Sequence, residues 1–92
     1  MKKRYHILVR GRVQGVGFRA FTKMSADNLE ITGWVRNVGD GETVEMEIQG
    51  ERLSVYDLIE AVRQGPTFGR VDHFQETPLA LRDEEEGFEI RV

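Results

Sequence analysis

The 92-residue sequence predicts a single α+β domain, residues 1–92, in which an antiparallel sheet carries two helices on one face. Five short stretches read as strands and two longer stretches repeat apolar residues with the period of a helix. Their order is β-α-β-β-α-β with a short terminal strand added, which is the split βαβ, or ferredoxin-like, arrangement. Right-handed crossovers place both helices of such a chain on the same side of the sheet.

The first strand is expected over residues 5–9, where apolar residues alternate with polar ones. Residues 11–17 form a loop with three glycines in seven positions, and the first helix is expected over residues 18–28. The residues expected to face the core along this helix are Phe18, Phe21, Ser25 and Leu29, with Met24 at its flank.

The second strand is expected over residues 31–38, with Gly33 marking a close approach of two backbones or a bulge. Gly39-Asp40-Gly41 is typical of a hairpin turn. The third strand, residues 43–49, alternates cleanly, with Val44, Met46 and Ile48 on one face. A strand with one apolar and one polar face belongs in an antiparallel sheet with helices on one side only.

The second helix is expected over residues 51–64, because its apolar residues follow the i, i+3, i+4, i+7 pattern. A fourth strand follows over residues 69–76, and Pro78 is expected to end it. The acidic run 83–86 favours a solvated turn over a metal site, since consecutive carboxylates repel one another. The last strand is short, residues 88–92.

Composition excludes several classes of function. The net charge of −3 argues against a nucleic-acid-binding module, which usually carries a basic face. There is no cysteine, so a disulfide framework, a thiolate metal site and a cysteine nucleophile are excluded. No stretch is apolar for long enough to span a membrane. We therefore expect a cytoplasmic protein that binds neither nucleic acid nor membrane and, given a polar sheet face rich in charge, a monomer.

The glycine-rich stretch 11–19 carries the strongest functional signal. A glycine loop that leads into a helix directs several free backbone N–H groups at one point, which favours an anion. Arg19 stands in the first helical turn, where a cation opposes the helix dipole, and a bound anion would relieve that conflict. A guanidinium can bind two phosphate oxygens at once. The simpler interpretation is a tight turn followed by a solvated arginine.

The residue inventory limits the chemistry. Neither an HExxH motif nor a Walker loop is present, and no histidine is close to the glycine loop in sequence. A backbone anion site, an arginine and an amide side chain can bind a phosphoryl group and position a water, which is most of what phosphoryl transfer requires. An acyl phosphate leaves as a carboxylate and needs neither a metal nor a general acid. We therefore expect no metal and no cofactor.

Two motifs extend this interpretation. The stretch from Val9 to Arg19 resembles the first signature of the acylphosphatase family, and Gly33-Trp34-Val35-Arg36-Asn37, followed by Asp40-Gly41 and Gly50, resembles the second. The resemblance spans nearly the whole chain. It implies an acylphosphatase that hydrolyses the carboxyl-phosphate bond of small acyl phosphates to a carboxylate and inorganic phosphate, without metal or phosphoenzyme.

The resemblance also implies residue roles. Arg19 would clamp the phosphoryl oxygens, and Asn37 would orient the attacking water. Without the resemblance, the sequence context of Asn37 indicates only a turn residue. An oxygen of the substrate phosphate would accept the proton from that water. The residues implied to bind phosphate, mostly through backbone amides, are Gln14, Gly15, Val16, Gly17, Phe18 and Arg19.

The chain departs from the second signature at one point. A valine usually follows the hairpin glycine by two positions, whereas Gly41 is followed by Glu42-Thr43-Val44, so we expect one extra residue in the hairpin tip or as a bulge. Two alternatives remain open: a non-catalytic phosphate-binding module of the same fold, and an acylphosphatase-like accessory domain that acts beside a larger enzyme.

Overall fold

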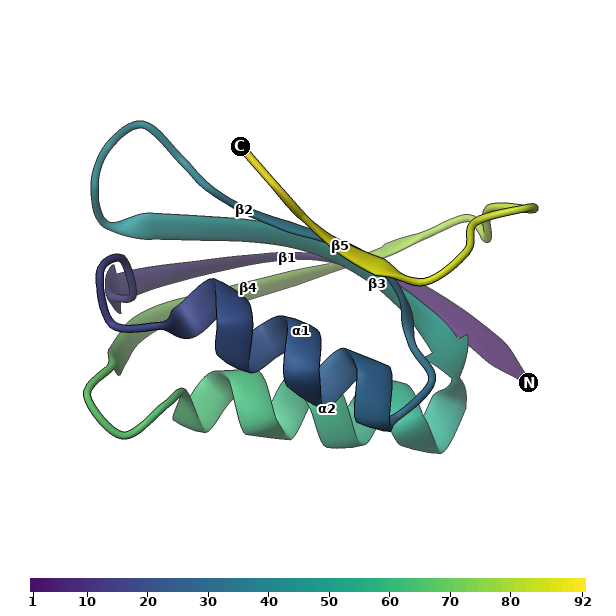
Figure 1. The fold of residues 1–92 in the computed structure, drawn as a ribbon. Helices are drawn as coiled ribbons and strands as arrows, with labels where there is room; N and C mark the ends of the chain where they lie inside the picture. The colour runs from purple at the N-terminus through teal and green to yellow at the C-terminus, as the bar shows by residue number, and fades with distance from the viewer.

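The computed structural model describes all residues from Met1 to Val92. The chain forms one layer of strands and one layer of two helices, and both helices lie on the same face of the sheet (Figure 1). The elements in chain order are β1 (Lys2–Arg12), α1 (Phe18–Asn28), β2 (Thr32–Asn37), β3 (Thr43–Glu51), α2 (Arg52–Gln64), β4 (Arg70–Leu79) and β5 (Phe88–Arg91). The ferredoxin-like α+β fold predicted from the sequence is confirmed.

The strands are ordered β4-β1-β3-β2-β5 across the sheet. The pairings of β1 with β3, β1 with β4 and β2 with β3 are antiparallel, as expected, but β5 pairs parallel with β2, so the sheet is mixed. The chain reverses direction after β4 and then joins the free edge of β2, which runs in the same direction as β5. The expectation of a fully antiparallel sheet was therefore wrong for the terminal strand.

The core lies between the helices and one face of the sheet. On β3, the predicted residues Val44, Met46 and Ile48 are all fully buried, which confirms the alternation. The second helix presents its apolar stripe to the sheet, also as predicted, through Val55, Leu58, Ile59 and Val62. Helix α2 packs against β1, β3 and β4, whereas α1 packs against β2 and β5.

The buried stripe of α1 agrees only in part with the prediction. Phe18 is fully buried and Leu29 packs against the core, as expected, but Phe21 and Ser25 are only half-buried. Its fully buried residues are Phe18, Thr22 and Ala26, whereas Met24 is 60% exposed. The hydroxyl of Thr22 donates to the carbonyl oxygen of Phe18 at 2.9 Å, so this buried polar group is paired within the helix. The apolar pattern alone did not indicate that Thr22 and Ala26 are buried.

Strand β4 is longer than predicted and continues through Pro78 to Leu79. Because β4 is an edge strand, proline is tolerated there: the side of a strand that faces solvent needs no N–H donor. A register shift between Arg10 and Gly11 bends the end of β1 where it pairs with β4. Gly11 has a φ of 142°, and a side chain there would collide with the carbonyl oxygen of Arg70.

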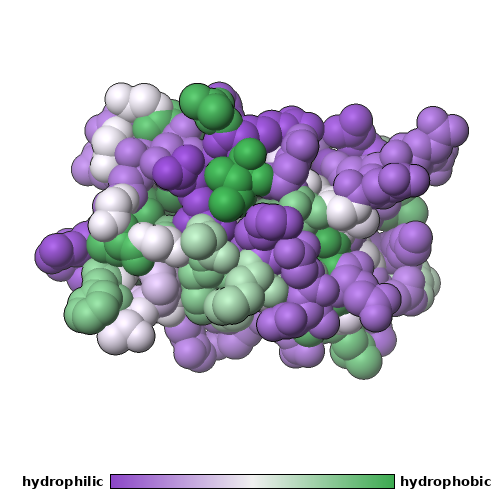
Figure 2. Space-filling model, viewed as in Figure 1, coloured by the Kyte–Doolittle hydropathy of each residue, from purple (hydrophilic) through white to green (hydrophobic).

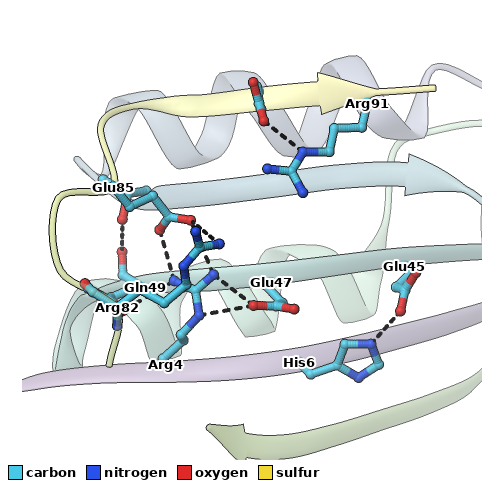
Figure 3. Close-up of polar contacts among 10 residues, drawn as sticks. Arg4, His6, Glu45, Glu47, Gln49, Arg82, Glu85 and Arg91 are labelled. Atoms are coloured by element: carbon cyan, nitrogen blue, oxygen red, sulfur yellow. Dashed lines mark hydrogen bonds and ion pairs between the residues drawn. The ribbon is translucent and has the colours of Figure 1, made fainter. Parts of the chain in front are cut away.

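The sheet face away from the helices carries ion pairs. Figure 3 shows Arg4 pointing from β1 towards Glu85 in the loop before β5, and His6 pointing to Glu45 on β3. The Glu85 side chain is only 10% exposed, so the expectation of a solvated acidic turn is wrong for this residue. Its neighbours Asp83, Glu84 and Glu86 are exposed, as expected.

The surface seen in Figure 2 is mainly hydrophilic, and its apolar residues form separate patches. Neither helix is long and apolar enough to cross a membrane.

Candidate functional site

The topology brings the glycine loop and Asn37 to the same edge of the sheet. Strands β1 and β2 both run antiparallel to β3, so they point the same way and their C-terminal ends meet. The glycine loop follows β1, and Asn37 is the last residue of β2. In Figure 1 the loop and the β2–β3 hairpin lie together at the left of the molecule.

The loop exposes backbone donors. Gly15 and Gly17 have φ values of 74° and 79°, in the left-handed region that glycine adopts most easily. No backbone N–H from residue 14 to residue 17 donates to another protein group. Helix α1 then begins at Phe18 with neither a side-chain cap nor an acidic residue in its first turn. The unpaired N–H groups of the loop and of the first helical turn thus lie at one helix N-terminus, which favours an anion.

Arg19 is the half-buried cation of this site. Its side chain forms no ion pair, whereas seven of the other arginines each bind a carboxylate within 4.0 Å. The two remaining unpaired arginines, Arg12 and Arg52, are exposed. Arg19 therefore combines partial burial with a free guanidinium, next to free amides, and this combination fits a bound anion better than a solvated arginine.

Asn37 supplies an unpaired acceptor. The oxygen Oδ1 of its side chain is buried and has no hydrogen-bond partner within the protein. Buried polar atoms are nearly always paired, so an orphan of this kind needs an explanation. A water that donates a hydrogen bond to Oδ1 would satisfy it. Asn37 is thus the last residue of β2, and its turn-like sequence context does not account for the unpaired oxygen.

A cavity of about 220 Å³ contains these groups. Its lining residues are Val13, Gly15, Gly17, Phe18, Arg19, Ala20, Asn37 and Ile90. The structure thus brings together four of the predicted phosphate-binding residues with Asn37. Two predicted members are not in the wall: Val16 packs against the core, and the Gln14 side chain turns to the β2–β3 hairpin.

Sequence reasoning missed Val13, Ala20 and Ile90, which also line the cavity. Ala20 could have been found, because it lies in the first turn of the helix that starts the anion site. Ile90 could not, since it reaches the cavity through the parallel pairing of β5 with β2, and a four-residue strand carries no signal for its partner. Trp34, on the other hand, is not part of the cavity. It is 7% exposed, with the guanidiniums of Arg36 and Arg91 over its ring.

The β2–β3 hairpin has no bulge, which leaves the turn as the place for the expected extra residue. The register between β2 and β3 runs without a shift from Thr32 opposite Gln49 to Asn37 opposite Val44, so there is no bulge. The side chain of Asp40 closes the turn by accepting hydrogen bonds from the backbone N–H groups of Glu42 and Thr43, both at 2.9 Å. Asn37 therefore keeps a regular strand position opposite Val44.

A larger hollow of about 670 Å³ lies at the opposite end of the sheet, around the start of β1 and the loop before β5. Its wall is mainly polar and includes Glu85, whose carboxylate is already bound by Arg4. It contains neither Arg19 nor Asn37. The smaller cavity is therefore the better candidate for the chemistry.

Comparison with known proteins identifies one family over nearly the whole chain. The acylphosphatase family model matches residues 5–90. An acylphosphatase of Geobacillus kaustophilus (strain HTA426) is 42% identical over 88 residues, which are 96% of this chain and 93% of that protein. An acylphosphatase of Salinibacter ruber is 44% identical over 98% of this chain and 94% of its own. The crystal structure of acylphosphatase from Bacillus subtilis superposes over 100% of both chains with a TM-score of 0.92 at 38% identity.

These similarities favour the enzyme over the binding module and the accessory domain. This chain belongs to the acylphosphatase family.

Proposed function

We propose that this acylphosphatase hydrolyses the carboxyl-phosphate bond of a small acyl phosphate in the cavity formed by the glycine loop, Arg19 and Asn37. One observation carries the proposal: a half-buried guanidinium without a counter-charge and a buried amide oxygen without a donor share one cavity that is lined by the glycine loop. A phosphoryl group would satisfy the first, and a water would satisfy the second.

The phosphoryl group is held by charge and backbone. The guanidinium of Arg19 binds two of its oxygens, and the backbone N–H groups from Gln14 to Arg19 donate to the same group. Bound in this way, the phosphoryl group is oriented and its developing charge is stabilised, which are the main needs of this reaction.

The attacking water is held by Asn37. The water donates one hydrogen to Oδ1 of Asn37 and directs its oxygen at phosphorus. A bond forms between the water oxygen and phosphorus, the bond between phosphorus and the bridging oxygen breaks, and the carboxylate leaves with that electron pair. The leaving carboxylate needs no proton at neutral pH, so no general acid or metal ion has to assist it.

The proton from the water goes to a non-bridging oxygen of the substrate phosphate. The composition of the cavity supports this, because its lining includes no carboxylate, imidazole, hydroxyl or amine that could act as a base. The products are a carboxylate and inorganic phosphate, and atoms and charges balance without a further reactant.

The test is hydrolysis of benzoyl phosphate, followed by its loss of ultraviolet absorbance in the presence of EDTA. Arg19→Ala should abolish turnover, since each lost charge-assisted hydrogen bond contributes about 1.5–3 kcal/mol. Arg52→Ala is the matched control, because Arg52 is also unpaired but exposed on α2. Full turnover by Arg19→Ala would contradict the proposal. A folded wild-type protein that binds phosphate but turns nothing over would favour the binding module.

We also propose that the enzyme works as a cytoplasmic monomer that binds neither nucleic acid nor membrane. The absence of cysteine is compatible with a reducing compartment. The open sheet face supports a monomer, since its charges are largely paired with one another within the chain.

A further inference from the structure

Few hydrogen bonds join the glycine loop to the rest of the protein. Val13 is buried and Val16 packs against the core, but these apolar contacts are not directional, and the backbone N–H groups of residues 14–17 bind no protein acceptor. Gly17 accepts the first hydrogen bond of helix α1 from Phe21. Beyond that helical bond, the only hydrogen bonds between residues 13–17 and the rest of the chain come from the side chain of Gln14.

Gln14 binds the hairpin beside Asn37. Its nitrogen Nε2 donates to the carbonyl oxygen of Val38 at 2.7 Å and to that of Thr43 at 2.9 Å. A primary amide has two N–H donors, so both are used. The carbonyl oxygen of Thr43 also accepts from the backbone N–H of Val38 at 2.9 Å, which closes the strand pair at this point.

These contacts lie directly next to the proposed water-binding residue. Val38 follows Asn37 in the chain, and Asn37 pairs with Val44, the neighbour of Thr43. One side chain therefore holds the backbone on both strands where Asn37 is placed. The Asn37 oxygen Oδ1 has no hydrogen bond of its own within the protein, so the direction of that oxygen depends strongly on the backbone position.

We propose that the side chain of Gln14 is a positioning residue that fixes the phosphate-binding loop relative to Asn37. This inference rests on the proposed function, in which the loop holds the phosphoryl group and Asn37 holds the water. For the reaction, the water oxygen must be aligned with phosphorus and the leaving oxygen. A misplacement of about 1 Å can lower the rate about 10²-fold. Gln14 thus acts through its side chain on the alignment, in addition to the backbone contact with phosphate.

The test replaces Gln14 by methionine, which has a similar length and no N–H donor. Gln14→Met should lower kcat for benzoyl phosphate by about tenfold or more. Gln64→Met is the matched control: Gln64 lies on the exposed side of α2, its hydrogen bond to Glu60 is 3.4 Å long, and its loss should leave kcat unchanged. Full kcat in Gln14→Met would overturn the inference.

A double-mutant cycle separates positioning from general stabilisation. If Gln14 acts through the placement of Asn37, Gln14→Met should change kcat by less than about twofold once Asn37 is already alanine. If Gln14→Met lowers kcat by the same factor with Asn37 present and with alanine at position 37, Gln14 only supports the fold and the inference is wrong. Turnover by the wild type in the same assay keeps this failure distinct from a failure of the proposed function.

Gln14→Glu provides a second variant of the same shape should the methionine variant not fold. At neutral pH its carboxylate faces two carbonyl oxygens without a hydrogen to donate, and protonation restores one donor. The ratio of its kcat to that of the wild type should therefore rise as the pH is lowered towards the ordinary pKa of glutamate. A ratio that stays constant with pH would contradict the role assigned to the Gln14 amide.

Discussion

Arg4 and Glu85, which are 81 residues apart in sequence, form a two-pronged ion pair on the open face of the sheet. The nitrogens Nη1 and Nη2 of Arg4 lie 2.8 and 3.1 Å from the two carboxylate oxygens of Glu85 (Figure 3). The same guanidinium donates to Glu47 and Gln49 on β3, and its side chain is only 1% exposed. The pair therefore anchors the loop before β5, and β5 carries Ile90 to the cavity wall.

Replacing Glu85 by glutamine should destabilise the fold. Arg4 loses a charged partner but keeps Glu47, so we expect a loss of about 1.5–3 kcal/mol in the free energy of unfolding at pH 7. Urea unfolding followed by the fluorescence of Trp34 measures this. Glu86→Gln is the control, because Glu86 is exposed and forms no ion pair, and it should change stability by less than about 0.5 kcal/mol. Equal effects of the two substitutions would contradict the assignment.

The same carboxyl predicts how stability depends on pH. Burial alone would raise the pKa of Glu85, but the hydrogen bonds and charge of Arg4 outweigh it, so the pKa lies below its ordinary value of 4.5. A group with a lowered folded pKa stabilises the protein above its unfolded pKa and loses that contribution as the pH falls through the folded pKa. The difference in stability between wild type and Glu85→Gln should therefore shrink on acidification below about pH 4.5. A constant difference between pH 7 and pH 3 would refute this.

Asn37→Ala should separate activity from stability. It removes the proposed water contact, so kcat should fall by about 10²-fold, in line with other lost polar contacts in active sites. The Asn37 oxygen Oδ1 accepts no hydrogen bond from another protein group, so the substitution breaks no such bond within the fold. The free energy of unfolding should consequently change little. A variant that loses activity and stability together would show that Asn37 is mainly a structural residue, and Asn28→Ala at the exposed end of α1 serves as the control.

Two glycines should respond differently to alanine. A side chain at Gly33 would collide with the carbonyl oxygen of Glu47 on the neighbouring strand, and its φ is 143°, so Gly33→Ala should cost about 3 kcal/mol or more. At Gly15 no atom lies within 4 Å of the added carbon, and only the φ of 74° is unfavourable, which costs about 1–2 kcal/mol. Urea unfolding of both variants measures the two losses of unfolding free energy. A larger loss in Gly15→Ala than in Gly33→Ala would contradict the close approach of β2 and β3.

Trp34 should become accessible when Arg91 is truncated. The guanidinium carbon of Arg91 lies 5.0 Å from the centre of the indole ring and helps to keep Trp34 only 7% exposed. Arg91→Ala should increase acrylamide quenching of the fluorescence and lower stability by about 0.5–1 kcal/mol, the usual contribution of an exposed cation–π contact. Unchanged quenching in Arg91→Ala, with Arg52→Ala as reference, would show that Arg91 does not cover the ring.

The strands and helices were predictable where the pattern is local. Val44, Met46 and Ile48 alternate because one face of β3 is buried, and the stripe of α2 repeats with the helical period. The stripe of α1 was predicted correctly at Phe18, but the buried Thr22 and Ala26 were not predicted, because neither carries a large apolar side chain. Pro78 was expected to end β4, yet an edge strand does not need its N–H.

The sequence by itself determined the order of the elements, the glycine loop at the start of α1 and the two motifs that contain Arg19 and Asn37. These features depend on period, on backbone conformation and on spacing, all of which are properties of neighbouring residues. Only the tertiary structure decided that Glu85 is an ion-pair partner of Arg4, that Ile90 lines the cavity and that the Gln14 side chain holds the hairpin. Each of these contacts joins residues 24 or more positions apart, and such a pairing is set by how whole strands and helices pack, which no local pattern encodes.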